Sequence, residues 1–147
     1  MDELLNDIRA EIEAVHQFIS AWFRGEGPSS AAAFAVGLAD RFGPGLINIQ
    51  PAGRVLTCEQ LLSSIRDRHG ANPQFRIEIG DVALRHVGSD GLVLATYVER
   101  QSGARQTSPE NDRISTVLMR RRADDGALEW LHIHETAVPA DPVSDVA

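Results

Sequence analysis

At 147 residues, with 43% hydrophobic and 24% charged side chains, the chain has the length of one domain and the composition of an ordinary globular protein. Its net charge of −7 and its pI of about 5.1 argue against a nucleic-acid groove and against binding to an anionic membrane surface. The single cysteine, Cys58, excludes an internal disulfide framework and predicts a reducing compartment, the cytoplasm, and no secretory signal or membrane span is predicted.

Two helices are predicted at the start of the chain. The first carries an apolar stripe whose members recur at spacings of three and four: Leu5, Ile8, Ile12, Val15, Ile19 and Trp22. The stretch from Gly25 to Pro28 should end it. Ser29 or Ser30 can then cap a second, alanine-rich helix that carries Phe34 and Leu38.

The middle of the chain predicts a short pair of strands and a third helix. The strands are expected at 46–50 and 54–56, on either side of a turn with Pro and Gly. Thr57 and Gln60 form a capping box at the start of the third helix, which His69-Gly70 should close.

Four strands are predicted in the second half, at 75–86, 92–100, 113–121 and 128–136. The first changes its apolar phase at Gly80-Asp81, where a β-bulge would keep one face inward. The polar stretch 101–112 is expected to be a mobile connection, and Asp-Gly at 125–126 indicates a hairpin. We expect one domain over 1–138 and a flexible tail over 139–147.

This order of elements predicts an α+β fold with three helices on one face of a strongly curved, mostly antiparallel sheet. One helical layer cannot cover both faces of so apolar a sheet. The face left over is expected to form a homodimer.

Three stretches resemble the nuclear transport factor two-like superfamily, which includes SnoaL-like cyclases, ketosteroid isomerases and the association domain of calmodulin-dependent kinase. They are Ala-Trp-Phe-Arg at 21–24, Ile-Gln-Pro-Ala-Gly-Arg at 49–54 before the Leu61-Leu62 helix, and His-Ile-His-Glu-Thr at 132–136. The resemblance implies a cone-shaped fold with an internal cavity, usually dimeric, and it implies no particular reaction. The kinase association domain has a cavity arginine at the position matching Glu135, so an anionic ligand is disfavoured there. No aspartate matches the general base of the ketosteroid isomerases.

The last strand carries the three candidate catalytic residues, Glu135, His134 and His132. Strand alternation puts Trp130, His132, His134 and Thr136 on one face and Leu131, Ile133 and Glu135 on the other. We expect Glu135 on the cavity side; a bulge near the strand end would bring the histidines inward instead. With a third ligand the histidines could hold zinc or iron, but we favour a structural role and predict no metal site.

The candidate ligand-binding residues are Tyr97, Glu99, Trp22, Phe18, Arg54 and Ile133. A carboxyl group at Glu99 or Glu135, buried against apolar walls, would gain the pKa of a general acid or base; the alternative is a rim carboxylate paired with Arg113 or Arg54. Tyr97 could donate to a ligand oxygen, and Arg54 could bind a carbonyl at the cavity mouth or simply lie on the surface. The aromatic residues of the first helix would line the cavity or belong to the core.

Two functions remain open. The first is a homodimeric domain that binds an apolar or weakly polar small molecule, as a SnoaL-like lyase or isomerase or as a carrier without chemistry. The alternative is a non-catalytic oligomerisation or interaction module. No phosphate loop, dinucleotide fingerprint or nucleophile elbow is present, so no cofactor is predicted, and whether the chain is an enzyme stays open.

Overall fold

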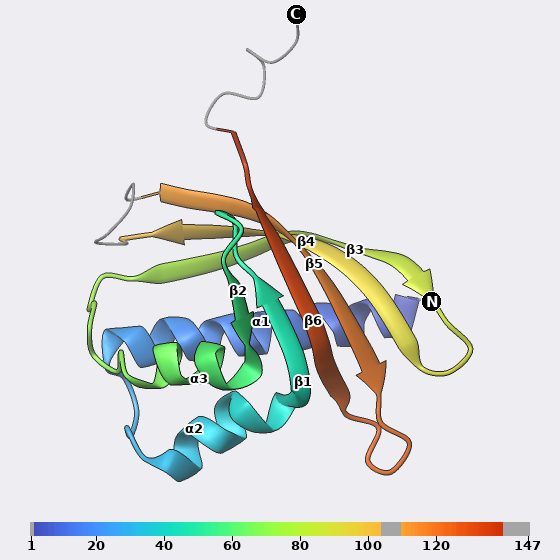
Figure 1. The fold of residues 1–147 in the computed structure, drawn as a ribbon, viewed down its shortest axis with the longest axis horizontal. Coiled ribbons are helices and arrows are strands. Elements are labelled where there is room, and N and C mark those ends of the chain that lie inside the picture. The colour runs from blue at the N-terminus through green and yellow to red at the C-terminus, as the bar shows by residue number, and fades with distance from the viewer. Residues whose placement is uncertain (1, 104–109, 140–147) are drawn as a thin grey trace, which may run out of the picture.

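The computed structural model describes residues 2–103 and 110–139, which form three α-helices packed on one six-stranded sheet (Figure 1). The helices are α1 (Asp2–Arg24), α2 (Ala31–Gly37) and α3 (Cys58–Arg66), with a short 3-10 helix η1 (Ala39–Arg41). The strands are β1 (Phe42–Ile49), β2 (Val55–Thr57), β3 (Arg76–Val87), β4 (Leu92–Ser102), β5 (Glu110–Arg121) and β6 (Leu128–Ala137). The predicted α+β class is confirmed. The predicted tail lies outside the described residues, apart from Pro139.

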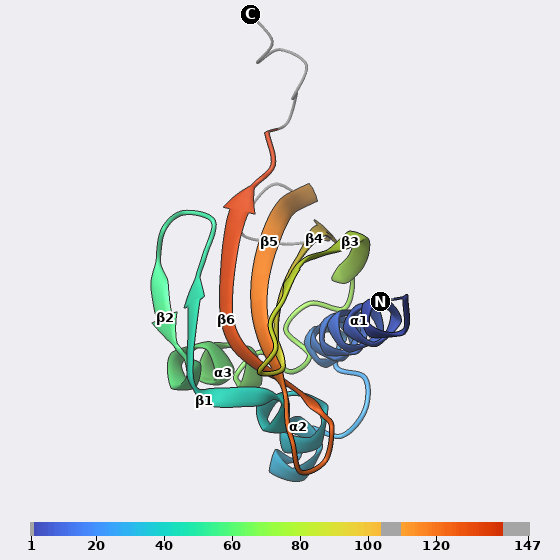
Figure 2. The same cartoon turned by 90° about the vertical axis from the view of Figure 1, so that its right-hand side faces the viewer.

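The sheet brings the first strands of the chain beside the last. Its order is β2-β1-β6-β5-β4-β3, and every neighbouring pair is antiparallel except β1 and β6, which are parallel. Figure 1 shows β1 beside β6, with α1 lying across the sheet behind them. The turned view shows strongly bent strands, with α1 beside β3 and α2 at the lower end (Figure 2).

Local chemistry explains where the helices begin. The Ser30 side chain accepts a hydrogen bond from the Ala33 backbone N–H at 3.1 Å, and so caps α2. At α3, Thr57 Oγ1 accepts from the Gln60 backbone N–H at 3.2 Å, while Gln60 Oε1 accepts from the Thr57 N–H at 3.0 Å. The predicted capping box is therefore confirmed. The first helix ends at Arg24, before Gly25, as expected.

The predicted bulge in β3 is also confirmed. The register with β4 shifts between Gly80 and Ala83, and Asp81 has a φ of 53°, in the left-handed region. The connection between β4 and β5, predicted over residues 101–112, is shorter than expected, because β4 continues to Ser102 and β5 already starts at Glu110. Of the predicted mobile stretch, residues 104–109 lie outside the described part of the chain.

A second bulge, which the sequence did not predict, changes the phase of β6. Met119 pairs with Trp130 and Leu118 with His132, so Leu131 is the extra residue. Strand alternation predicted Trp130 on the same strand face as His132 and His134, and Leu131 on the same face as Glu135. Both assignments are wrong. Trp130 is turned inward, 0% exposed, and its indole N–H donates to Glu11 Oε2 at 2.9 Å. Burial of this large side chain with its donor paired favours the bulged strand over a regular one.

The core lies between α1 and the inner face of the sheet. The helix contributes the buried side chains Ile8, Ile12, Val15 and Trp22. The strands contribute Val93, Ala95, Tyr97, Val117, Met119, Trp130 and Ile133. Toward one end of the same strands the inward side chains become polar, and a cavity opens there.

Candidate functional site

A cavity of about 720 Å³ lies between the helices and the polar end of the sheet. One wall is apolar and consists of Ile19, Phe23, Leu61, Ile65, Phe75 and Ile77. The opposite wall is polar and consists of Asn48, Glu99, Gln101, Asn111, Arg113 and Glu135. Such a volume, with an apolar side and a few convergent polar groups, is typical of a small-molecule site.

The polar wall forms because the inward residues of two neighbouring strands, β4 and β5, change from apolar to polar at the same end of the sheet. The inward residues of β4 are Val93, Ala95, Tyr97, Glu99 and Gln101. Those of β5, taken in the reverse direction, are Met119, Val117, Ser115, Arg113 and Asn111. The antiparallel register places Glu99 opposite Arg113 and Gln101 opposite Asn111, so polar residues face polar residues across the strands.

The innermost polar group is a buried ion pair between Glu99 of β4 and His16 of α1. His16 Nε2 lies 3.1 Å from Glu99 Oε1, and both side chains are almost completely buried. The other ring nitrogen, Nδ1, lies 2.8 Å from the Ile12 carbonyl oxygen. When Glu99 is ionised, both ring nitrogens face oxygens that can only accept, an arrangement that favours the doubly protonated imidazolium.

The surroundings shift the pKa values of this pair in opposite directions. Burial lowers the pKa of His16, but the charge and hydrogen bond of Glu99, with the Ile12 carbonyl, outweigh burial and raise it. Burial raises the pKa of Glu99, but the charge and hydrogen bond of His16, then Arg113 and Gln101, lower it to about 2. Burial and the nearby carboxylates raise the pKa of Tyr97, whose hydroxyl lies 3.5 Å from His16 Nε2. Tyr97 therefore remains a neutral phenol beside a charged pair.

A second ion pair completes the polar wall. Arg113 NH1 donates to Glu135 Oε1 at 3.1 Å, and Asn48 Nδ2 donates to Glu135 Oε2 at 3.0 Å. The Glu135 and Arg113 side chains are 11% and 12% exposed, and both line the cavity. The two carboxylates of the wall are thus each matched by a cation of the same protein.

Comparison with solved structures identifies the relatives of the chain. An NTF2-like protein of unknown function from Pseudomonas aeruginosa is 33% identical, with a TM-score of 0.79 over 90% of this chain and 99% of that one. Identity at this level over almost the whole chain decides the family. This chain belongs to the NTF2-like family.

More distantly related structures share the fold of the chain described here. One from Rhodospirillum rubrum, described as NTF2-like and of unknown function in nutrient uptake, is 18% identical with a TM-score of 0.69, covering 90% of this chain and 99% of that one. The CaMKII hub of S. rosetta is 14% identical with a TM-score of 0.63, covering 88% and 95%. No protein-family model matches the chain, and no curated protein does.

The predicted site residues of the NTF2-like domain fall into two groups. Glu99 and Glu135 line the cavity, and Tyr97 and Ile133 are buried close to its polar wall. Arg113, which the sequence offered only as a partner for a rim carboxylate, pairs with Glu135 inside the cavity instead of at a rim.

The other candidates lie away from the cavity. Trp22 and Phe18 stack on each other, with ring centroids 5.6 Å apart, and both pack against Phe34 of α2. The cavity wall uses the neighbouring helix positions Ile19 and Phe23, because α2 covers the face that carries Trp22. Arg54 is exposed and is not among the residues that line the cavity.

The two histidines of β6 are on the outer face of the sheet. His132 is half-buried and His134 is exposed, and neither lines the cavity. Within the described residues, no three His, Cys, Asp or Glu side chains are placed to hold a metal ion. The inward-facing alternative for the histidines is not realised.

His16 is the main residue of the site that the sequence analysis missed. It lies on the apolar stripe of α1, four residues after Ile12 and three before Ile19. A titratable residue at such a position must be paired when buried, and that was the available signal. Asn48, Gln101 and Asn111 gave no comparable signal, because polar residues near strand ends usually face solvent.

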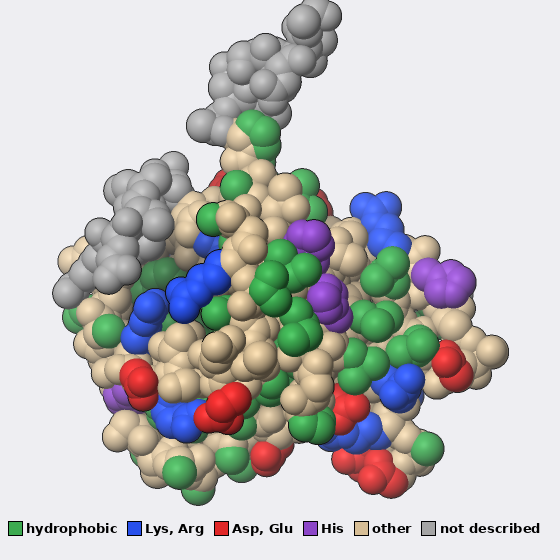
Figure 3. Space-filling model, viewed as in Figure 1, with side chains coloured by type: hydrophobic (Ala, Val, Ile, Leu, Met, Phe, Trp, Pro, Cys, Tyr) green, Lys and Arg blue, Asp and Glu red, His purple; other side chains and the backbone are tan. Residues whose placement is uncertain are grey.

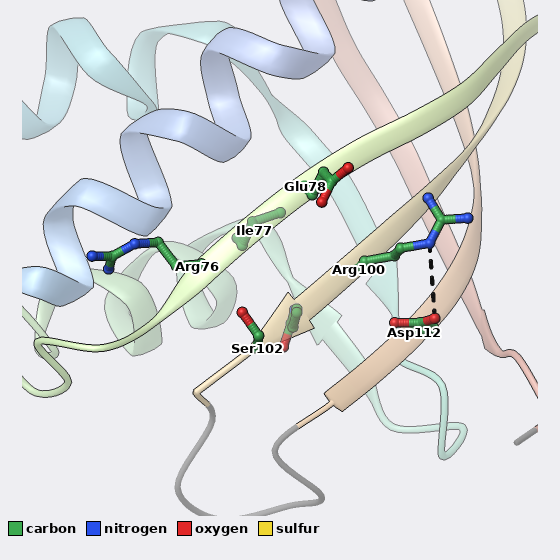
Figure 4. Close-up of a pocket in the computed structure, with 7 residues that line it drawn as sticks. Arg76, Ile77, Glu78, Arg100, Ser102 and Asp112 are labelled. Carbon is green, nitrogen blue, oxygen red and sulfur yellow. Dashed lines mark ion pairs between the residues drawn. The ribbon is translucent and has the colours of Figure 1, made fainter.

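A second depression, of about 420 Å³, lies at the ends of β3, β4 and β5 (Figure 4). Its arginines, Arg76 and Arg100, point in different directions. Arg76 NH1 donates to the Phe75 carbonyl at 2.9 Å, whereas Arg100 Nε lies 3.9 Å from Asp112 Oδ2. These charges do not converge on a common ligand.

In residues 2–103 and 110–139, no helix has both the length and the apolarity to cross a membrane.

Proposed function

We propose that this NTF2-like domain binds a small, mostly apolar organic molecule in its cavity, with the polar end of the molecule against the strands. The observation that carries the proposal is the two-sided cavity, with aliphatic and aromatic side chains from α1, α3 and β3 facing a hydrogen-bonding wall on the sheet. The apolar wall supplies affinity by removing ligand surface from water, and the polar wall fixes orientation.

The geometry favours binding over proton abstraction as the primary role. Glu99 accepts from His16 and, at 2.6 Å, from Gln101 Nε2, so both carboxylate oxygens are already bonded. Its pKa of about 2 makes it a weak base at neutral pH. A SnoaL-like lyase or isomerase built on this site would first have to free a Glu99 oxygen from His16 or Gln101 before that oxygen could take a proton.

Filling the cavity is expected to abolish ligand binding. Ser64 of α3 lines the cavity and Ser63 does not, although both are half-buried. Ligands are sought in a thermal-shift screen of ketones, amides, acids and aromatic compounds, since a ligand that binds only the native state raises the melting temperature. The stabilisation should disappear in Ser64→Trp, whose indole occupies ligand space, and persist in Ser63→Trp.

A flat response of the wild-type protein to the whole screen would contradict the binding proposal and favour the alternative, a module whose role is to associate. Retention of binding in Ser64→Trp would place the ligand outside this cavity.

A second role, self-association through the outer face of the sheet, is supported by the side chains on that face. Ile114 of β5 is 47% exposed, and Val55 of β2 is 59% exposed. Hydrophobic and histidine side chains gather over β6 and its neighbours, with charged ones mainly toward the edges (Figure 3). The CaMKII hub has the same fold, and we propose that this domain forms a homodimer by pairing two such faces.

In light scattering at micromolar concentration, the wild-type protein is expected to show twice the 16.0 kDa mass of one chain. Ile114→Asp should give the monomer mass, because it places a carboxylate in the centre of an apolar contact. Val36→Asp is the matched control, since Val36 of α2 is 74% exposed but lies away from the sheet, and should remain dimeric. A wild-type monomer would disprove the dimer.

A further inference from the structure

We propose that Glu135 makes the cavity selective for ligands whose inner end is uncharged, by occupying a carboxylate site that the protein itself provides. The inference rests on the proposed function, since it assumes that the cavity takes a small molecule. It adds the chemical class of the ligand and names the residue that decides this class.

Glu135 is held as a bound carboxylate ligand would be held. Arg113 donates to one of its oxygens and Asn48 to the other, at 3.1 and 3.0 Å. All three side chains line the cavity, and they come from the adjacent strands β1, β6 and β5, with Glu135 in the middle. A guanidinium and an amide, each donating to a different oxygen, form an arrangement suited to recognising a carboxylate.

The rest of the polar wall on the strands leaves no unpaired charge to attract a ligand ion; Arg68, which follows α3 and also lines the cavity, is exposed and does not belong to this wall. Glu99 is paired with His16, so the wall and the layer behind it hold two carboxylates and two cations in matched pairs. A ligand anion at this depth would have to displace Glu135 from Arg113 or lose its water without gaining a partner. A ligand cation would find both carboxylates already bonded.

An uncharged polar group has suitable partners on the same wall. Gln101 and Asn111 line the cavity, and Asn111 Nδ2 donates to Gln101 Oε1 at 3.3 Å. Side-chain amides both donate and accept, so they can bond an amide, a ketone or a hydroxyl group without leaving a charge unpaired. The class we infer is therefore a neutral carbonyl or hydroxyl compound with an apolar body.

Removing the Glu135 carboxylate should turn the wall into an acceptor of anions. Glu135→Ala keeps Cβ and removes the remaining methylene and carboxylate, which together match acetate in size and shape. Arg113 and Asn48 would then face an empty carboxylate site. Acetate is expected to raise the melting temperature of Glu135→Ala relative to sodium chloride at equal ionic strength, and to leave the wild type unchanged.

The decisive experiment compares three compounds that share one apolar body: phenylacetamide, phenylacetate and phenethylamine. Calorimetry is expected to show that the wild type prefers the amide over both ions, by about tenfold or more, and that Glu135→Ala prefers phenylacetate by a similar factor. Glu135→Gln, whose amide oxygen can still accept from Arg113, covers the case in which the alanine variant does not fold; because it leaves the Arg113 cation without a counter-ion, it should lose the discrimination against phenylacetate. Glu78→Ala removes an exposed carboxylate from β3 and should behave as the wild type.

The outcomes separate the two proposals. Binding of phenylacetate by the wild type as tightly as phenylacetamide, or a Glu135→Ala protein that ignores both acetate and phenylacetate, would overturn the selectivity while leaving a binding cavity. If neither the wild type nor any variant binds any of the compounds, and a wider screen also fails, the proposed function falls and the inference falls with it.

Discussion

Replacing Glu99 with glutamine is expected to lower the free energy of unfolding by about 3–5 kcal/mol between pH 4.5 and 6.5, the ordinary pKa values of glutamate and histidine. Glu99 and His16 are 4% and 6% exposed, and their charged atoms lie 3.1 Å apart. The substitution leaves the imidazolium in a buried place without its counter-ion, and the ring must lose its proton or remain unpaired. Urea unfolding of the two proteins at the same pH measures the difference.

The pH dependence of this difference follows from the two pKa shifts. Because the folded-state pKa of Glu99 is lowered to about 2, its contribution is complete above pH 4.5 and is lost as the pH falls toward 2. Because the folded-state pKa of His16 is raised above 6.5, its contribution is complete below pH 6.5 and is lost as the pH rises through the raised value. The difference between wild type and Glu99→Gln should therefore be largest between these limits.

Glu78→Gln provides the control, since Glu78 is an exposed carboxylate on the neighbouring strand and its replacement should cost no more than about 0.5 kcal/mol. A Glu99→Gln protein as stable as wild type, or a difference that keeps growing into alkaline pH, would show that the pair is not a buried salt bridge.

Replacing Trp22 with alanine is expected to lower the free energy of unfolding by about 3–5 kcal/mol. Trp22 is 2% exposed, its ring lies 5.0 Å from that of Phe34 and 4.5 Å from that of His69, and its indole N–H donates to the Arg66 carbonyl at 3.2 Å. Removing it leaves a cavity where α1, α2 and the end of α3 meet.

A fall in melting temperature of more than about 6 °C is expected for Trp22→Ala in a chain of this size. Trp22→Phe, which keeps most of the apolar volume and loses the hydrogen bond to Arg66, should lie between alanine and wild type. A melting temperature unchanged by the alanine substitution would mean that α1 does not pack as described.

Features that depend on neighbouring residues were predictable from the sequence. The stripe of α1, the Thr57–Gln60 capping box and the Gly80-Asp81 bulge each rest on residues a few positions apart, and each is found in the structure. The inward direction of Glu135 followed from its matching position in a related fold, and the cavity lining includes it.

The partners of the polar residues could not be predicted in this way. The position of His16 on the apolar stripe indicated that it needs a partner but not that this partner is Glu99, because the contact forms only when α1 is laid across β4. Arg113 looked like a surface residue at a strand end until the register set it opposite Glu99 and beside Glu135.

The sequence by itself determined the order of the elements, the end of α1, the capped starts of α2 and α3 and the α+β class, because periodicity and capping are properties of short contiguous segments. The end of α3 was not determined in this way: the helix stops at Arg66, before the predicted His69-Gly70. Tertiary structure alone decided that Leu131 bulges to bury Trp130 and that α2, by covering Trp22 and Phe18, leaves Ile19 and Phe23 to line the cavity. It also decided that four ionisable side chains form two ion pairs, His16 with Glu99 and Arg113 with Glu135. The physical reason is that burial energies depend on which distant segments pack together, and a buried charge is tolerated only where such packing supplies its partner.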